Sequence, residues 1–112
     1  MSLYKEYLKE REGIEVYEND CGFISYSYIE EVNALYLAEF YVIPAKRNTP
    51  AGYRLYQRAV NLAKSNGCTK IMGSVDVSTN GYELSEKLMG KLGFRFYKKV
   101  GYLIYFIKTI QD

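Results

Sequence analysis

The sequence predicts an α/β fold in which a mixed, mostly antiparallel central sheet is flanked by helices. Between residues 14 and 43, alternating or apolar segments follow one another with short turns between them, which favours three antiparallel strands. After Pro44, a segment with apolar residues at helical spacing separates two strand segments, which predicts one strand-helix-strand crossover with a parallel pair. A chain of 112 residues has room for a single hydrophobic core, so we expect residues 1–112 to form one domain.

Residues 2–11 are predicted to form a short helix, because their apolar residues recur at helical spacing. These residues are Leu3, Tyr4, Tyr7 and Leu8. Ser2 can cap the start of this helix, and Gly13 ends it.

Three strands are expected next, over residues 14–17, 22–29 and 34–43, joined by turns at residues 18–20 and 30–33. The second strand alternates between two faces, with Ile24, Tyr26 and Tyr28 on one face and Ser25 and Ser27 on the other. The third strand is the most apolar, so we expect it to lie centrally in the sheet.

A second helix is expected from Pro50 or Ala51 to about Ser65, because proline suits the first helical position. Its core-facing residues are predicted to be Leu55, Ala59, Leu62 and Ala63. A buried strand over residues 69–77 should then pair in parallel with the third strand.

A third helix is expected to start at a cap formed by Thr79 or Asn80 and to end at Gly93. Its predicted apolar stripe consists of Leu84, Leu88 and Leu92. The chain should end in a hairpin of residues 94–97 and 102–107, with its turn at residues 98–101.

The composition excludes several classes of function. Histidine is absent, which excludes serine–histidine and cysteine–histidine catalysis and histidine-ligated metals. Two cysteines, Cys21 and Cys68, are too few for a zinc cluster, so we expect no metal and two free thiols. The net charge of +2 comes from interspersed acidic and basic residues, which does not indicate a nucleic-acid partner. No apolar stretch approaches the roughly 20 residues of a membrane span, so no membrane partner and a cytoplasmic location are expected.

Residues 39–55 bring together the end of an apolar strand, a polar loop and the start of a helix. The free N–H groups and the dipole of a helix start attract anions. Lys46, Arg47 and Arg54 add positive charge there, and Gly52 lets a bulky phosphate approach the backbone. A diphosphate is the ligand expected at such a turn. The alternative is an ordinary strand-to-helix connection with solvated charges.

The strand end Val42-Ile43-Pro44 is followed by Arg47, Gly52 and Leu55. This pattern resembles the acyl-CoA signature of the GNAT superfamily of N-acetyltransferases, in which valine-x-proline precedes Arg/Gln-x-x-Gly-x-Gly/Ala and a helical leucine. Residues 87–94 end in Lys-Leu-Gly-Phe and resemble a later helix of the same family. The resemblance extends from about residue 13 to residue 108. It implies a GNAT-like fold and acetyl-CoA as co-substrate.

The same resemblance implies which residues contact acetyl-CoA. The diphosphate would be held by Arg47, Asn48, Thr49, Ala51, Gly52, Tyr53 and Arg54. The pantetheine arm would run along the preceding strand, with main-chain partners at Tyr41 and Val42 and the Val42 amide near the thioester carbonyl. Asn80 follows a later strand, where the family often has an asparagine bonded to pantetheine, but its displaced position favours a helix cap.

Two residues depart from the family pattern. Pro50 stands where the first glycine is usual and removes one N–H donor from the loop, although the Thr49 hydroxyl can be offered instead. Met89 occupies the position where many members carry a tyrosine that protonates the departing thiolate, and methionine cannot donate a proton. Tyr97 and Tyr82 are the nearest alternatives for this general acid.

Glu39 lies three residues before Val42 on the same apolar strand. A carboxylate partly withdrawn from water at this place would suit a general base that takes a proton from an amine. Family members with glutamate before a similar aromatic-valine pair support this role. The alternatives are a glutamate on the solvated face of the strand and one paired with a lysine or arginine.

The sequence therefore predicts an acetyl-CoA-dependent N-acetyltransferase that acts on a primary amine of a protein, peptide or small molecule. The alternative is a GNAT-like module that binds CoA or a partner protein without turnover, as Pro50 and Met89 suggest. Only residues 2–11 are available to wall the acceptor site, so an open groove is expected, which suits a macromolecular amine or a site completed by a partner. The tyrosine-rich final hairpin could pair with a second copy, so a homodimer is considered as well.

Overall fold

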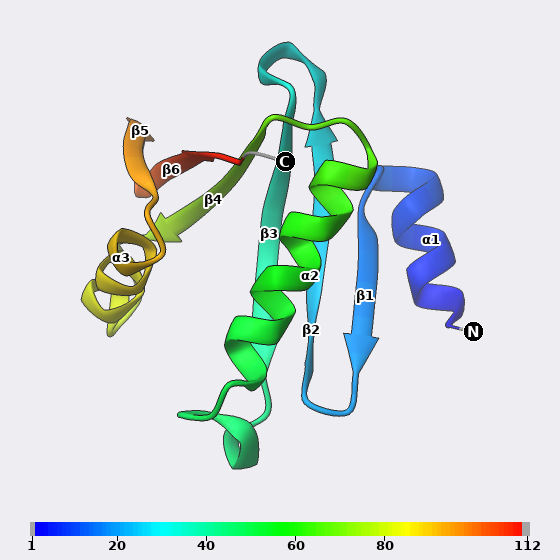
Figure 1. Ribbon diagram of the computed structural model, residues 1–112, viewed down its shortest axis with the longest axis horizontal. Coiled ribbons are helices and arrows are strands. Elements are labelled where there is room, and N and C mark those ends of the chain that lie inside the picture. The colour runs from blue at the N-terminus through cyan, green and yellow to red at the C-terminus, as the bar shows by residue number, and fades with distance from the viewer. Residues whose placement is uncertain (1, 111–112) are drawn as a thin grey trace.

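The structure is a computed structural model that describes residues 2–110. Over these residues, six strands form one sheet in the order β1-β2-β3-β4-β6-β5 (Figure 1). The strands are β1 (Glu15–Asn19), β2 (Gly22–Ile29), β3 (Ala34–Val42), β4 (Lys70–Asp76), β5 (Arg95–Val100) and β6 (Leu103–Thr109). The helices are α1 (Leu3–Glu12), α2 (Ala51–Ser65) and α3 (Tyr82–Lys91), with 3-10 turns η1 (Glu30–Val32) and η2 (Pro44–Lys46).

All neighbouring strands run antiparallel except β3 and β4, which run parallel and are joined through α2. The predicted fold class and the predicted crossover are therefore confirmed. β3 lies between β2 and β4, inside the sheet, as its apolar sequence indicated.

α2 lies across one face of the sheet, over β2 and β3 (Figure 1). Its buried side chains include Leu55, Ala59 and Ala63, which contact Ile24 and Leu35 of the strands in one hydrophobic cluster. Three of the four predicted core residues of this helix are thus buried, and the fourth, Leu62, is half-buried. α3 lies on the same face, because its Met89 methyl group packs directly over Gly73 of β4.

α1 lies beside β1 at one edge of the sheet (Figure 1). The Lys5 N–H donates to the Ser2 hydroxyl at 3.4 Å, so Ser2 caps the helix as predicted, and Gly13 ends it. The apolar stripe behaves differently, because only Leu8 is buried and Leu3 is 84% exposed. An edge position gives the helix one line of contact, which is too narrow to cover four apolar side chains.

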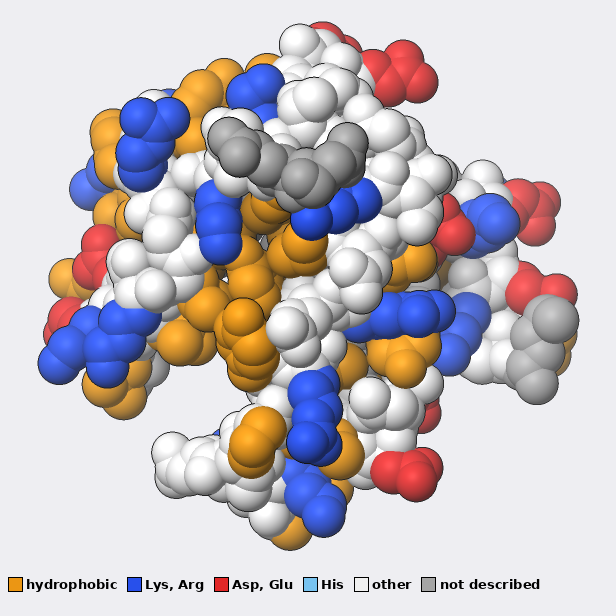
Figure 2. All heavy atoms as spheres, viewed as in Figure 1, with side chains coloured by type: hydrophobic (Ala, Val, Ile, Leu, Met, Phe, Trp, Pro, Cys, Tyr) orange, Lys and Arg blue, Asp and Glu red, His pale blue; other side chains and the backbone are white. Residues whose placement is uncertain are grey.

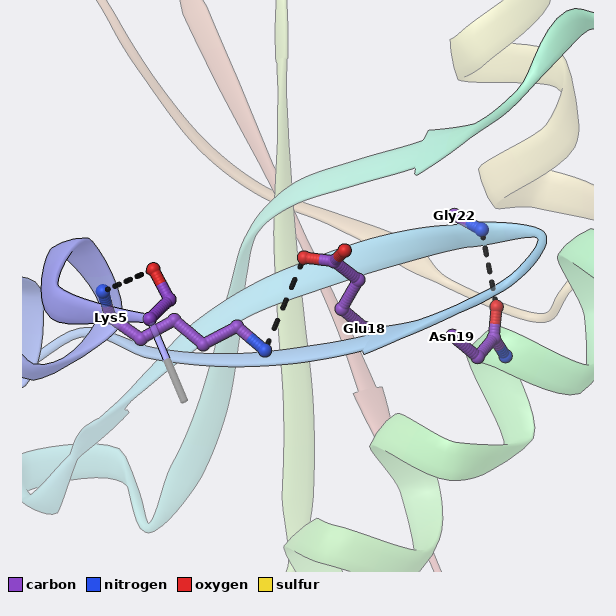
Figure 3. Close-up of polar contacts among 5 residues, drawn as sticks. Lys5, Glu18, Asn19 and Gly22 are labelled. Atoms are coloured by element: carbon purple, nitrogen blue, oxygen red, sulfur yellow. Dashed lines mark hydrogen bonds and ion pairs between the residues drawn. The ribbon is translucent and has the colours of Figure 1, made fainter.

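The turn between β1 and β2 is shorter than predicted. Asn19, expected in the turn, still belongs to β1, and its side-chain oxygen accepts hydrogen bonds from the N–H groups of Cys21 at 2.8 Å and Gly22 at 3.1 Å. Figure 3 shows the Asn19–Gly22 bond together with the ion pair between Lys5 and Glu18. The side chain of Asn19 closes the turn in place of the backbone.

The predicted cap of α3 is wrong, and its predicted apolar stripe is only partly right. The N-cap residue is Gly81, at φ 81°, and it makes no side-chain cap. Thr79 donates its hydroxyl to the Asp76 carbonyl at 2.7 Å instead of capping the helix. Leu84 and Leu88 are exposed, at 74% and 54%. Leu92, the third predicted residue, is half-buried and packs against the core together with Met89, so the contact stripe is rotated away from Leu84 and Leu88 only.

The final hairpin is also longer than predicted. β5 continues through residues 98–100, and the turn consists of Gly101, at φ 59°, and Tyr102. The positive φ of Gly101 allows a two-residue turn, which leaves Lys98 and Lys99 free to extend the strand. Cys21 and Cys68 are free thiols, as expected, and both are half-buried.

Candidate functional site

A β-bulge in β3 decides which of its side chains face the helices. Ser25 pairs with Glu39 and Tyr26 pairs with Leu37, so Ala38 is one extra residue in β3. Leu37 packs towards the hydrophobic cluster under α2. Strict alternation would place Glu39 on that same face. The bulge moves Glu39 to the opposite face and brings the next residues, Phe40 and Val42, under α2, beside Gly52.

β3 and β4 separate beyond the bulge. Their pairing ends at Leu37 and Gly73, although β3 continues to Val42 and β4 continues to Asp76. Figure 1 shows the two strands diverging from this point. We call the space between residues 38–42 and residues 74–76 the β3–β4 gap. It leaves the inner edge of β3 without a strand partner.

The N–H and C=O groups of successive residues of β3 point alternately to β2 and to this gap. The Ile43 N–H donates to the Cys21 carbonyl at 2.8 Å. Because hydrogen-bonded and non-hydrogen-bonded pairs alternate in an antiparallel ladder, Tyr41 directs its main-chain groups to β2, and Val42 directs its own to the gap. The same alternation points Phe40 to the gap. Arg47 closes the outer end, since its Nε donates to the Val42 carbonyl at 2.9 Å.

The first turn of α2 leaves three N–H groups, those of Ala51, Gly52 and Tyr53, without partners inside the helix. The Arg54 N–H is the first to bond four residues back, to the Pro50 carbonyl at 3.0 Å. The Ala51 N–H donates to the Thr49 hydroxyl at 3.2 Å, and that hydroxyl donates to the Lys46 carbonyl. The N–H groups of Gly52 and Tyr53 remain as the donors that an anion could use.

Gly52 is not required by packing. A Cβ at this position would lie 3.7 Å from Val42 Cγ2 and 3.9 Å from the Phe40 ring, which are ordinary contacts. Gly22 differs, because a Cβ there would lie 1.9 Å from the Tyr41 carbonyl oxygen. Glycine at position 52 therefore keeps open a space that the fold itself does not need.

Basic and aromatic side chains surround this turn. Lys46, Arg47 and Arg54 are exposed, and the Arg47 guanidinium lies 5.6 Å from the centre of the Tyr41 ring. Asn48, at φ 62°, turns the loop towards the helix. Tyr53 is 54% exposed.

A groove of about 590 Å³ begins at Tyr53 and runs along α2 towards the end of β6. Its residues are Tyr53, Tyr56, Gln57, Val60, Asn61, Lys64, Lys108, Thr109 and Ile110. Figure 2 shows hydrophobic side chains in the hollow beside α2, with lysine and arginine side chains around it. The Lys108 ammonium donates to the Tyr56 hydroxyl at 2.8 Å, which fixes one cation on its wall.

On the sheet face opposite α2, Glu39 accepts a hydrogen bond from the Ser25 hydroxyl at 3.0 Å. Ser25 is 1% exposed, whereas Glu39 is exposed rather than partly buried as expected. The Tyr36 and Ser74 hydroxyls lie 2.7 Å apart and bridge β3 and β4 where the gap begins. The sequence gives no signal for these three hydroxyl residues, because their proximity depends on the bulge and on the strand order.

A family model described as the acetyltransferase (GNAT) family matches residues 3–94. The chain belongs to the GNAT family. A search of curated proteins finds no match to its sequence.

Solved GNAT structures share the fold. The PaiA N-acetyltransferase of Thermoplasma acidophilum, in complex with coenzyme A, superposes with a TM-score of 0.74 at 19% identity, over 96% of this chain and 69% of that one. An aminoglycoside 6'-N-acetyltransferase complexed with coenzyme A gives 0.70 at 16% identity, over 95% and 78%. Nourseothricin acetyltransferase gives 0.65 at 19% identity, over 80% of this chain and 57% of its own length. At these identities the likeness concerns the fold.

The remaining residues expected from the GNAT pattern are spread over the molecule. Tyr97 lies on β5, two strands and so about 10 Å from β4, with the Lys98 ammonium 5.7 Å from its ring. Tyr82 begins α3 and packs against the core. Asn80 is exposed in the turn before α3. Asp76 ends β4 nearby, and hydrogen bonds from the Ser78 hydroxyl and N–H hold the pKa of its carboxyl below the usual value.

Within residues 2–110, no three histidine, cysteine or carboxylate side chains gather closely enough to bind a metal ion. None of the helices described over the same residues is both long enough and apolar enough to cross a membrane.

Proposed function

We propose that this GNAT chain is an acetyl-CoA-dependent N-acetyltransferase that transfers an acetyl group to a primary amine of a protein, peptide or small molecule. One observation carries the proposal. The free N–H groups of Gly52 and Tyr53 stand at the end of the same strand whose Phe40 and Val42 main chain faces the β3–β4 gap. One elongated ligand with a diphosphate and an amide-bearing arm can use both features.

In this proposal the first turn of α2 binds the diphosphate of acetyl-CoA. Gly52 and Tyr53 donate their N–H groups, and Arg47 and Arg54 supply charge. Asn48, Thr49 and Ala51 shape the loop, since the Thr49 hydroxyl is already used within it. The groove that starts at Tyr53 has the size and the lysines to accommodate the nucleotide end of the same molecule.

The chain's own groups then serve the transfer. The Val42 N–H donates to the thioester oxygen as negative charge develops there. Glu39, across the sheet from α2, takes a proton from the amine, whose nitrogen attacks the carbonyl carbon as the carbon–sulfur bond breaks. The leaving group is the thiolate of CoA, which then takes up a proton. Tyr82 is placed better than Tyr97 to protonate it, because α3 packs on β4 and Tyr97 lies beyond β6.

A second function, binding of CoA without turnover, is favoured by Met89. Its methyl group occupies the α3 position that covers Gly73, where the pairing of β3 and β4 ends. A side chain that cannot donate a proton therefore stands nearest to that point on α3. Pro50 supports the same alternative because it lacks an N–H group.

Thermal unfolding with acetyl-CoA, followed by a thiol-release assay over a panel of amines, tests the two functions. Ligand at 100 times its Kd should stabilise the native state by about 2.7 kcal/mol. Thiol release that requires an amine supports the transferase. Equal stabilisation by CoA and acetyl-CoA without thiol release supports the binding module. An unchanged melting temperature with both compounds contradicts both functions.

A further inference from the structure

Ser25 is the one polar residue that is fully buried among residues 2–110, at 1% exposure. A buried hydroxyl costs free energy unless it is hydrogen-bonded, and in a strand core an apolar side chain avoids that cost. The Ser25 hydroxyl donates to Glu39 Oε1 at 3.0 Å. Its bond is thus made to an exposed carboxylate on the neighbouring strand and not to the backbone.

This contact depends on the bulge. Because Ala38 is an extra residue, Glu39 stands directly opposite Ser25 in the β2–β3 register. Side chains directly opposite each other in an antiparallel pair lie close enough to interact. The contact fixes one oxygen of a side chain that is otherwise free to move in solvent, on the strand that borders the β3–β4 gap.

We propose that Ser25 is a positioning residue for Glu39, an inference that rests on the proposed transferase function. The buried hydroxyl anchors Oε1 and leaves Oε2 to receive the proton from the amine. A serine held by the sheet loses little freedom when it makes this bond, so it orients the carboxylate at small entropic cost. Correct orientation of a base is worth up to two orders of magnitude in rate.

Steady-state kinetics of four variants tests the proposal. Ser25→Ala should lower kcat about tenfold. It should leave the stabilisation by acetyl-CoA unchanged, because the diphosphate site lies at the start of α2, on the opposite face of the sheet from Ser25. Ser25→Thr, which keeps a hydroxyl, should recover most of the loss. Ser27→Ala is the matched control, since Ser27 is a half-buried serine on the same strand and face. It should behave as the wild type.

The double variant separates positioning from a general effect on the fold. In a Glu39→Gln background, Ser25→Ala should lower kcat no further, because the two residues act as one unit. Additive losses, or a Ser25→Ala enzyme with wild-type kcat, would overturn the positioning role and leave the transferase proposal standing. A wild-type protein that is stabilised by acetyl-CoA but releases no thiol with any amine would overturn both.

Discussion

At the residue scale, Gly52 is a glycine that the packing of the fold does not require and that ligand binding is expected to require. Glycine near a helix start lowers helix stability relative to alanine, and the packing around Gly52 would accept a Cβ. Gly90 of α3 is a matched case, because a Cβ there would meet nothing within 4 Å. Neither glycine is required by packing, and Gly52 alone of the two lies beside the free N–H groups of α2.

Gly52→Ala should therefore raise stability by up to about 1 kcal/mol and weaken acetyl-CoA binding at least tenfold, or about 1.4 kcal/mol. Gly90→Ala should raise stability similarly without changing the affinity. Thermal unfolding with and without acetyl-CoA measures both effects. Equal affinity in the two variants would place the diphosphate elsewhere.

The raised pKa of Tyr28 predicts that the folded protein loses stability at high pH. Burial, followed by the nearby Tyr26, Glu15 and Cys68 groups, raises the pKa of Tyr28 to about 12 from an ordinary value of 10.0. The unfolded chain then loses its proton first, so the free energy of unfolding should fall as pH rises from 10 towards 12. Urea unfolding across this range should show a smaller fall for Tyr28→Phe than for the wild type. An identical pH dependence of the wild type and Tyr28→Phe would show that Tyr28 does not cause the fall in stability.

At the scale of elements, α1 illustrates how a helix attaches to a sheet edge. Its side-chain contacts include the buried Leu8 and two ion pairs, Lys5–Glu18 at 4.0 Å and Lys9–Glu15 at 3.8 Å. Exposed ion pairs contribute little because water and salt screen them. Burial of Leu8 should therefore hold the helix in place.

Leu8→Ala should lower the free energy of unfolding by about 2 kcal/mol or more, whereas Lys5→Ala should lower it by less than about 1 kcal/mol. Urea unfolding of both variants checks this order. Glu18 is exposed and Lys5 is half-buried, so salt reaches the pair and its small effect should shrink further in high salt. A larger loss from Lys5→Ala than from Leu8→Ala would show that the ion pair carries the attachment.

At the scale of the whole molecule, β5 is a free edge of the sheet, and all six of its residues are exposed. The homodimer expected from the final hairpin stays a prediction. Two copies paired through this edge would bring the lysines of both strands, Lys98 and Lys99, close together. Exposed lysines on an edge strand oppose such pairing by charge repulsion.

A dimer through β5 should consequently be weak in low salt and stronger in high salt, where the repulsion is screened. Sedimentation of the wild type at two salt concentrations, beside a Lys98→Gln/Lys99→Gln variant, measures this. The variant should dimerise more readily than the wild type in low salt. A β5 dimer would be contradicted if the wild type at both salt concentrations and the variant all remained monomeric at high protein concentration.

Local patterns determined much of the fold. The caps at Ser2 and Gly13, the strand-stopping Pro44 and the apolar stripe of α2 act through neighbours in the chain, so their effects were predictable from spacing. The loop after β3 was predictable for the same reason, because a helix start offers N–H groups wherever it occurs.

Tertiary structure decided the rest. One extra residue at Ala38 moved Glu39 to the face opposite α2 and set it against Ser25. α3 packed through Met89 and not through Leu84 and Leu88, because the contact with Gly73 selected its orientation. Periodicity states which residues share a face. Tertiary packing decides which of those faces lies against the core. It also decides where a β-bulge shifts the register of a strand by one residue.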